Sequence, residues 1–311
     1  MTGRIVVGDL TEKKPVLGDY LLLILLGAIL GSNFMMTKIS VLYLPPMFVV
    51  TFRLAVAAGM LLIIMKAAGL TFPTGRIWIP LIIAGIVGLT MPFSLLAWAQ
   101  QKVDAGLAAI LMATMPLFTL LLAQLFTQDE KPNRYSIGGF AIALFGVIVL
   151  FGFDKLASLA DQSVRQYAVI GAAFCYGLNA IVTKKLIGMD WRQSTACLLV
   201  VGFVASIPLL IVSDLSSLRA PEEAWAATIY TGIVPTAIGT IIIILVVRRT
   251  SASFLSQINF LVPLFGVAFA ILFVNEALPA NGALALLTIL CGVALARRRP
   301  KRKFISINKG V

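Results

Sequence analysis

Long apolar runs alternate with short polar or proline-containing segments along almost the whole chain. A helix needs about 20 mostly apolar residues to cross the hydrocarbon core of a bilayer, and most of the runs have about that length. The pattern predicts an all-α membrane protein with ten transmembrane helices, of which the fifth and tenth are short. We place them at residues 17–42, 46–66, 77–99, 104–127, 136–153, 165–187, 193–213, 224–247, 251–274 and 279–296.

The distribution of basic residues predicts the side of the membrane that each connection faces. An even number of helices places both termini on one side, and Lys and Arg accumulate in cytoplasmic segments. The tail after residue 296 is strongly basic, so we place both termini in the cytoplasm. Losing one helix would exchange the sides of every later connection, so the asymmetry supports ten helices. Of the 25 Lys and Arg residues, the outside segments then hold only Lys38, Lys102, Lys155, Arg165 and Arg219.

The second half of the chain repeats the first, with five predicted helices in each half. Because five is odd, the halves enter the membrane from opposite sides, as in the inverted repeats of many secondary transporters. We expect a cytoplasmic segment at 1–16, two inverted five-helix repeats at 17–153 and 165–296 around a central cavity, and a basic cytoplasmic tail at 297–311. The recurring pairs include Gly31 and Gly177, Asn33 and Asn179, Thr37 and Thr183, Lys38 and Lys184, Pro116 and Pro263, and Asp129 and Glu276.

Composition agrees with a membrane location and narrows the chemistry. Hydrophobic residues make up 60% of the chain and charged residues 12%, with a mean hydropathy of +1.00. There is no His, and every Asp or Glu lies in a connection or at the end of an apolar run, which argues against Ser-His-Asp catalysis and histidine metal sites. The three cysteines have no C-x-x-C spacing, and no glycine-rich phosphate loop is present. We therefore expect neither an enzyme nor a cofactor or metal.

The net charge of +12 does not indicate nucleic-acid binding, because the basic residues form short clusters between apolar runs and in the tail. The expected partners are a small-molecule substrate and the lipid bilayer, with the protein as a monomer or a weak dimer.

Two asparagines lie near the middle of predicted helices, Asn33 in the first and Asn179 in the sixth. A buried amide without a partner is costly, so each must face protein or water rather than lipid. Interhelical hydrogen bonding is one interpretation, since Gly27 and Gly31 suit close helix packing. The other is that both amides line the central cavity, and the two interpretations are compatible.

Arg53 lies about 10 Å into the second helix by helical rise. An ionised side chain within a span is costly and indicates a function by default. Three roles of the Arg53 side chain are open. It could bind a substrate carboxylate through a bidentate hydrogen bond, extend outward to the membrane surface, or cap helix carbonyls. Its counterpart in the second half is Leu199, so an anion site would be one-sided.

Four further residues complete the expected substrate-binding set of Asn33, Arg53, Trp98, Tyr176, Asn179, Gln257 and Asn259. Trp98 belongs either to an interfacial aromatic belt or to the cavity wall. Tyr176 precedes Asn179 by three residues and shares its helix face. Gln257 and Asn259 are amides within the ninth predicted helix and need partners there.

These features together resemble the EamA-type transporters of the drug/metabolite transporter superfamily. The resemblance covers residues 17–296 and rests on GSNF in the first helix, Phe52-Arg53 in the second, and a proline in the fourth and ninth helices followed by an acidic residue. It implies a ten-helix inverted-repeat carrier in the bacterial inner membrane with a central cavity. It also implies export of amino acids or related small metabolites. Relatives that carry phosphorylated sugars would need several cavity cations, and only Arg53 is available here.

We therefore predict a secondary transporter that exports small organic metabolites by alternating access. Efflux of lipophilic or cationic drug-like compounds is the alternative. Without an acid or His in mid-membrane, we expect either a facilitator or proton coupling through Glu276 or Asp129 at a helix end.

Overall fold

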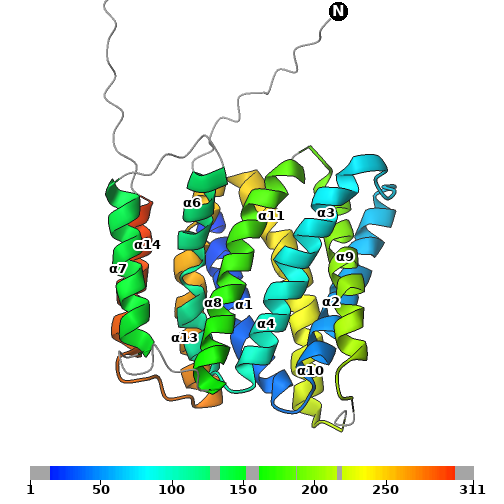
Figure 1. Cartoon of the computed structure of the whole chain (residues 1–311). Coiled ribbons are helices and arrows are strands. Elements are labelled where there is room, and N and C mark those ends of the chain that lie inside the picture. Colours follow the sequence, from blue (N-terminus) through cyan, green and yellow to red (C-terminus); the bar gives the residue numbers. More distant parts are fainter. Residues whose placement is uncertain (1–14, 127–133, 152–160, 187, 216–218, 298–311) are drawn as a thin grey trace, which may run out of the picture.

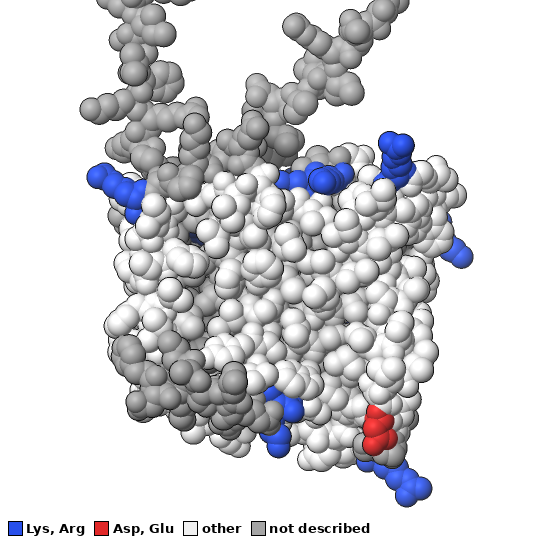
Figure 2. Space-filling model, in the orientation of Figure 1, with Lys and Arg blue, Asp and Glu red and all other residues white. Residues whose placement is uncertain are grey.

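The computed structural model describes residues 15–126, 134–151, 161–186, 188–215 and 219–297, and within these ranges the chain is all-helical without strands. The helices stand side by side in a single bundle (Figure 1). Asp129, one of the two predicted coupling residues, lies outside the described residues. On the face that Figure 2 shows, Lys and Arg lie toward the two ends of the bundle, and the surface between them that is not covered by grey atoms carries no charge, as expected for a surface that faces lipid.

The first half contains α1 (Leu17–Val41), α2 (Pro46–Ala67), a third span built from η1 (Gly75–Ile77), α3 (Trp78–Gly85), η2 (Ile86–Thr90) and α4 (Met91–Gln100), then α5 (Ala105–Met112), α6 (Met115–Phe126) and α7 (Arg134–Phe151). The second half contains α8 (Asp161–Val182) with η4 (Thr183–Leu186), α9 (Trp191–Ile211), then α10 (Glu222–Thr231), η5 (Gly232–Ile238) and α11 (Gly239–Arg249) as one span, α12 (Ala252–Leu255), α13 (Ile258–Val274) and α14 (Gly282–Ala296).

Seven of these helical segments are long and apolar enough to span a membrane: Leu17–Val41, Pro46–Ala67, Gly75–Gln100, Ala105–Phe126, Ser163–Leu186, Trp191–Ile211 and Glu222–Arg249. Three shorter apolar helices, Arg134–Leu150, Ile258–Val274 and Gly282–Ala296, lie where the fifth, ninth and tenth helices are predicted. The ninth differs most from expectation, because the chain turns between α12 and α13 and the apolar helix α13 begins only at Ile258.

Prolines explain the irregular turns. Pro116 has no N–H to donate to the carbonyl of Met112, and α5 ends at that residue. Pro235 lies within η5, and Pro92 is the second residue after η2. Both η2 and η5 are π-helical, a wider turn that commonly accompanies a missing helical hydrogen bond and a functional site.

Two helix crossings between the halves are formed by equivalent atoms. A Cβ added to Gly31 of α1 would lie 2.6 Å from Cβ of Phe265 and 2.9 Å from the nitrogen of Gly266 in α13. A Cβ added to Gly177 of α8 would lie 2.9 Å from Cβ of Phe118 and 2.9 Å from the nitrogen of Thr119 in α6. In both crossings a helix from one half packs on a helix from the other.

The crossing of α7 and α14 pairs the two halves in the same way. A Cβ on Gly146 would meet the Ala285 carbonyl and the Ile289 nitrogen, each at 3.1 Å, and a Cβ on Gly292 would meet the Gly139 carbonyl and the Ala143 nitrogen, each at 2.6 Å. Small residues thus allow the backbones to approach closely, as they do in many membrane bundles.

Candidate substrate-binding site

Arg53 lies inside the bundle, with 4% of its surface exposed. Its Nε and Nη2 atoms both donate to Oγ1 of Thr236, at 3.1 and 2.7 Å. Its guanidinium carbon lies 3.9 Å from the ring centroid of Phe93 in α4. Among the described residues Arg53 forms no ion pair. The guanidinium group is therefore a buried cation held by a neutral hydroxyl and an aromatic face.

The position of Thr236 follows from the proline before it. Pro235 cannot donate to the Thr231 carbonyl, which precedes it by four residues. The Thr236 hydroxyl donates to this carbonyl at 2.6 Å. A hydroxyl has one proton and two lone pairs, so this bond leaves the oxygen of Thr236 as an acceptor for Arg53.

Tyr176 and Asn179 of α8 border this cluster. The Tyr176 ring meets the Phe93 ring edge-on, with centroids 6.4 Å apart. One turn further along α8, the Asn179 amide lies flat against Gly88 of η2, where an added Cβ would be 2.4 Å from its Nδ2. Arg53, Tyr176 and Asn179 are therefore brought to one region by α2, α4, η2 and α8.

Asn33 and Asn179 share an unusual feature. In each, Oδ1 is buried and accepts no hydrogen bond from the described residues. An unsatisfied buried acceptor costs about 1–3 kcal/mol. Neither oxygen makes the interhelical bond that one interpretation of the sequence required. Both residues retain some exposed surface, and their helices, α1 and α8, both pack against α4 and α5.

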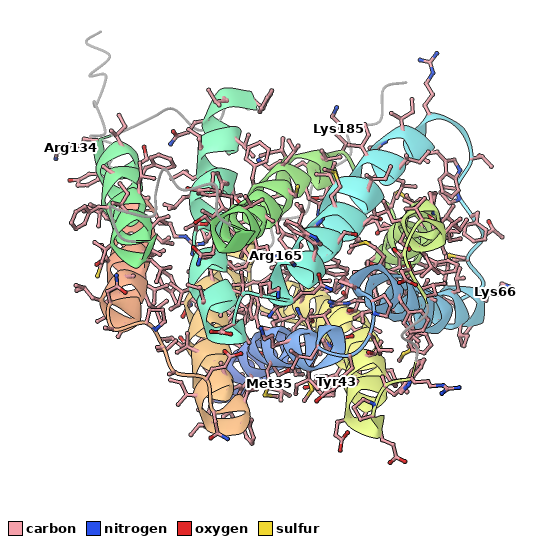
Figure 3. All side chains as sticks on the ribbon, turned by 60° about the horizontal axis from the view of Figure 1, so that its bottom comes forward. Met35, Tyr43, Lys66, Arg134, Arg165 and Lys185 are labelled. Carbon is pink, nitrogen blue, oxygen red and sulfur yellow. The ribbon has the colours of Figure 1, made fainter. Side chains whose placement is uncertain are left out.

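Trp98 lies away from Arg53, near the end of α4. The Arg165 guanidinium carbon is 4.5 Å from a Trp98 ring centroid, and its Nη1 donates to the Trp98 carbonyl at 2.5 Å and to Oε1 of Gln101 at 3.0 Å. Trp98 lines a surface cleft of about 480 Å³ with residues 41–47, Gln101, Ser213 and Asp214. Figure 3 shows Arg165 and Tyr43 on the part of the bundle turned toward the viewer, with Arg134 and Lys185 at the upper edge.

Gln257 and Asn259 lie where α13 begins. Asn259 donates from Nδ2 to the Ser256 carbonyl at 3.0 Å, and Arg297 reaches the same carbonyl at 2.9 Å. Asn259 precedes Gly266, which faces α1, by about 10 Å of helical rise. Among the described residues, no hydrogen bond or ring contact joins either amide to Arg53.

Sequence reasoning missed Thr236, Phe93 and Gly88. The available signal was the pair of prolines, Pro92 and Pro235, each near a glycine in the third span of its half. The contacts also revise the counterpart of Arg53. The Arg53 carbonyl lies at 3.1 Å from a Cβ built on Gly232, just as the Leu198 carbonyl does from one built on Gly85. By these contacts the counterpart of Arg53 is Leu198 rather than Leu199, and the second half still has an uncharged leucine at this position.

Glu276 makes contacts of another kind. Its two carboxylate oxygens accept hydrogen bonds from the backbone N–H groups of Ala105 and Gly106, both at 2.9 Å. The carboxylate thus satisfies the first turn of α5, where a negative charge is favoured by the helix dipole.

A helical bundle with an apolar outer surface, a buried cation without a described carboxylate partner and two unpaired amide oxygens indicates a multi-pass membrane protein of the transporter class. The chain belongs to the EamA-like transporter family, whose family model matches residues 18–152 and 166–298. This confirms the resemblance seen in the sequence.

Similar proteins come from several bacteria. The "Probable terminal-alkyne amino-acid exporter" of Streptantibioticus cattleyicolor is 30% identical over 252 residues, covering 79% of this chain and 82% of the relative. The "Probable amino-acid metabolite efflux pump" of Escherichia coli K12 is 25% identical over 289 residues, covering 88% and 93%. A solved crystal structure matches with a TM-score of 0.64 at 18% identity, covering 90% of this chain and 96% of that chain, and supports the overall fold.

Proposed function

We propose that this protein is a secondary transporter that exports small organic metabolites, most simply amino acids or related compounds, across the bacterial inner membrane. Two relatives that cover most of the chain are named as amino-acid exporters or efflux pumps, which supports this substrate class. The observation that carries the proposal is Arg53, a buried cation for which the described residues supply no carboxylate. A substrate carboxylate provides the missing negative charge.

The proposed architecture is ten transmembrane helices in two inverted five-helix repeats, 17–153 and 165–296, with both termini in the cytoplasm. Three observations support it: the two segments matched by the family model, the equivalent contacts of Gly31 and Gly177, and the π-helical turns η2 and η5 in both third spans. Two related packings of such repeats give a central site access to each side in turn.

In this proposal the central contacts are Asn33, Arg53, Tyr176 and Asn179. Trp98 lines the path at one end of the bundle, and Gln257 and Asn259 line it at the other. The two unpaired amide oxygens accept hydrogen bonds from the substrate or its water once the halves move apart. The transported compound is therefore a small molecule with a carboxylate at one end and hydrogen-bond donors nearby.

The test is transport by the purified protein in proteoliposomes, with counterflow of labelled L-amino acids from a panel of the twenty standard compounds. Arg53→Ala removes the cation, and Lys66→Ala removes an exposed cation from the end of the same helix as a matched control. A charge-assisted hydrogen bond contributes about 1.5–3 kcal/mol, which is a factor on the order of 10 to 100 in affinity. Arg53→Ala should raise KM by that factor, and Lys66→Ala should leave KM unchanged.

Efflux of lipophilic cations is the alternative that the same variants separate. A buried Arg53 repels a cationic substrate, so Arg53→Ala should retain or increase such efflux while it loses amino-acid transport. Wild-type activity of Arg53→Ala toward every amino acid that the native protein carries would refute the proposed role of this residue.

A further inference from the structure

The way in which Thr236 holds Arg53 bears on how the substrate is recognised. The two residues are 183 positions apart, one on α2 and the other on η5, so each half of the chain contributes one of them. Both are buried, with 4% of the surface exposed in each case. Two of the five guanidinium N–H groups are used, one on Nε and one on Nη2.

The acceptor is neutral, which matters for binding. A carboxylate in place of the Thr236 hydroxyl would fix the guanidinium group as well, but it would also cancel the charge. The hydroxyl orients the group and leaves the positive charge for a ligand. Its own proton is committed to the Thr231 carbonyl at 2.6 Å, so its oxygen stays directed at Arg53. The Phe93 ring holds the flat face of the guanidinium group at 3.9 Å.

With one edge held by Thr236 and one face by Phe93, the remaining donors are those of Nη1 and the second N–H of Nη2. No described residue accepts a hydrogen bond from Nη1. We infer that Thr236 is the positioning residue of the carboxylate site: it turns Arg53 so that its Nη1–Nη2 end binds the substrate carboxylate. The inference rests on the proposed function and deepens it, since it assigns preference for a carboxylate over its neutral amide to the pair of Arg53 and Thr236.

Three variants test the inference. Thr236→Val keeps the branched shape and removes the hydroxyl, whereas Thr236→Ser keeps the hydroxyl. Thr240→Val is the matched control, because Thr240 lies one turn further along and its hydroxyl bonds only the carbonyl of Thr236 among the described residues, at 2.6 Å. The measured quantity is the ratio of KM for the amino acid of the panel that the wild type carries best to KM for the corresponding amino-acid amide.

We expect Thr236→Val to raise KM for the amino acid about 10-fold, with the maximal rate within about twofold of the wild type. The preference over the amide should fall by a similar factor. Thr236→Ser should restore both values, and Thr240→Val should match the wild type. In the Arg53→Ala background, Thr236→Val should cause no additional loss, because the two residues act as one unit.

The outcomes distinguish the inference from the proposed function. If Arg53→Ala loses the preference for the carboxylate and Thr236→Val keeps it, the positioning role is wrong and the proposed function stands. An equal loss from Thr236→Val with and without Arg53 also overturns the positioning role. If the wild type carries no amino acid of the panel, or does not prefer any to its amide, the proposed function fails and the inference fails with it.

Discussion

Gly31 lies where α1 crosses α13 with no space for a side chain, and its replacement by alanine tests the packing directly. The added Cβ would lie 2.6 Å from Cβ of Phe265, 2.9 Å from the nitrogen of Gly266 and 3.1 Å from the Phe265 carbonyl carbon. Optimal contact between carbons is about 3.5–4.0 Å. Two of the three atoms belong to the backbone, so no rotamer change relieves the clash, and the two helices must separate by about 1 Å.

Overpacking of this kind costs about 1–3 kcal/mol. Gly59→Ala in α2 is the matched control, because nothing lies within 4 Å of its added Cβ. Both substitutions share the gain in helix propensity of about 1 kcal/mol, so the difference between them isolates the packing term. Gly177→Ala should behave like Gly31→Ala, with a slightly smaller penalty, because its contacts are 2.9, 2.9 and 3.0 Å.

The assay is thermal unfolding of the purified variants in detergent, followed by tryptophan fluorescence. Gly31→Ala and Gly177→Ala should melt several degrees below Gly59→Ala, which should melt at or above the wild type. Melting of all three variants at one temperature would refute the close crossing of α1 on α13 and of α8 on α6.

Three further predictions follow from single contacts. Gly88→Ala places a Cβ 2.4 Å from the Asn179 amide and displaces it, so transport should fall at least about tenfold while the protein remains folded. Glu276→Ala removes two hydrogen bonds to a charged acceptor and should lower the free energy of unfolding by about 1.5–3 kcal/mol, measured by denaturant titration. Side-chain hydrogen bonding from Arg192 lowers the pKa of Asp190, which precedes α9, from 3.8 to about 2. Its contribution to stability is therefore present above pH 3.8 and lost as the pH falls toward 2. The melting temperature of Asp190→Asn should vary less than that of the wild type over this interval.

The first two of these predictions have a matched control variant, and the third has a result that would contradict it. Gly171→Ala meets only the end of the Leu95 side chain at 3.6 Å and should transport normally. Glu222→Ala removes an exposed carboxylate from the first turn of α10 and should change stability by less than about 1 kcal/mol. An identical melting curve for Asp190→Asn and the wild type at every pH would show that the pair with Arg192 contributes nothing.

The sequence alone determined the helical class, most of the spans, the repeats and the family. Inside lipid every backbone N–H and C=O must bond within its own segment, so the length of an apolar run directly indicates a helix. The seven long helices satisfied this criterion, and two of the three shorter ones are the fifth and tenth, whose apolar runs were already short in the sequence. The sequence did not predict the break before α13. Residues 251–274 read as one apolar run of the right length for a single helix, whereas the structure divides them into α12 and α13.

The sequence also singled out Arg53, Asn33 and Asn179, because a charge or an amide inside an apolar run is costly wherever it ends up. Only the tertiary structure decided which groups meet them. Thr236 and Phe93 are ordinary residues of a membrane helix, and they reach Arg53 because α2, α4 and η5 converge from distant parts of the chain. The local sequence shows that burying a polar group is costly at these positions. The packing of helices from both halves determines which group is its partner.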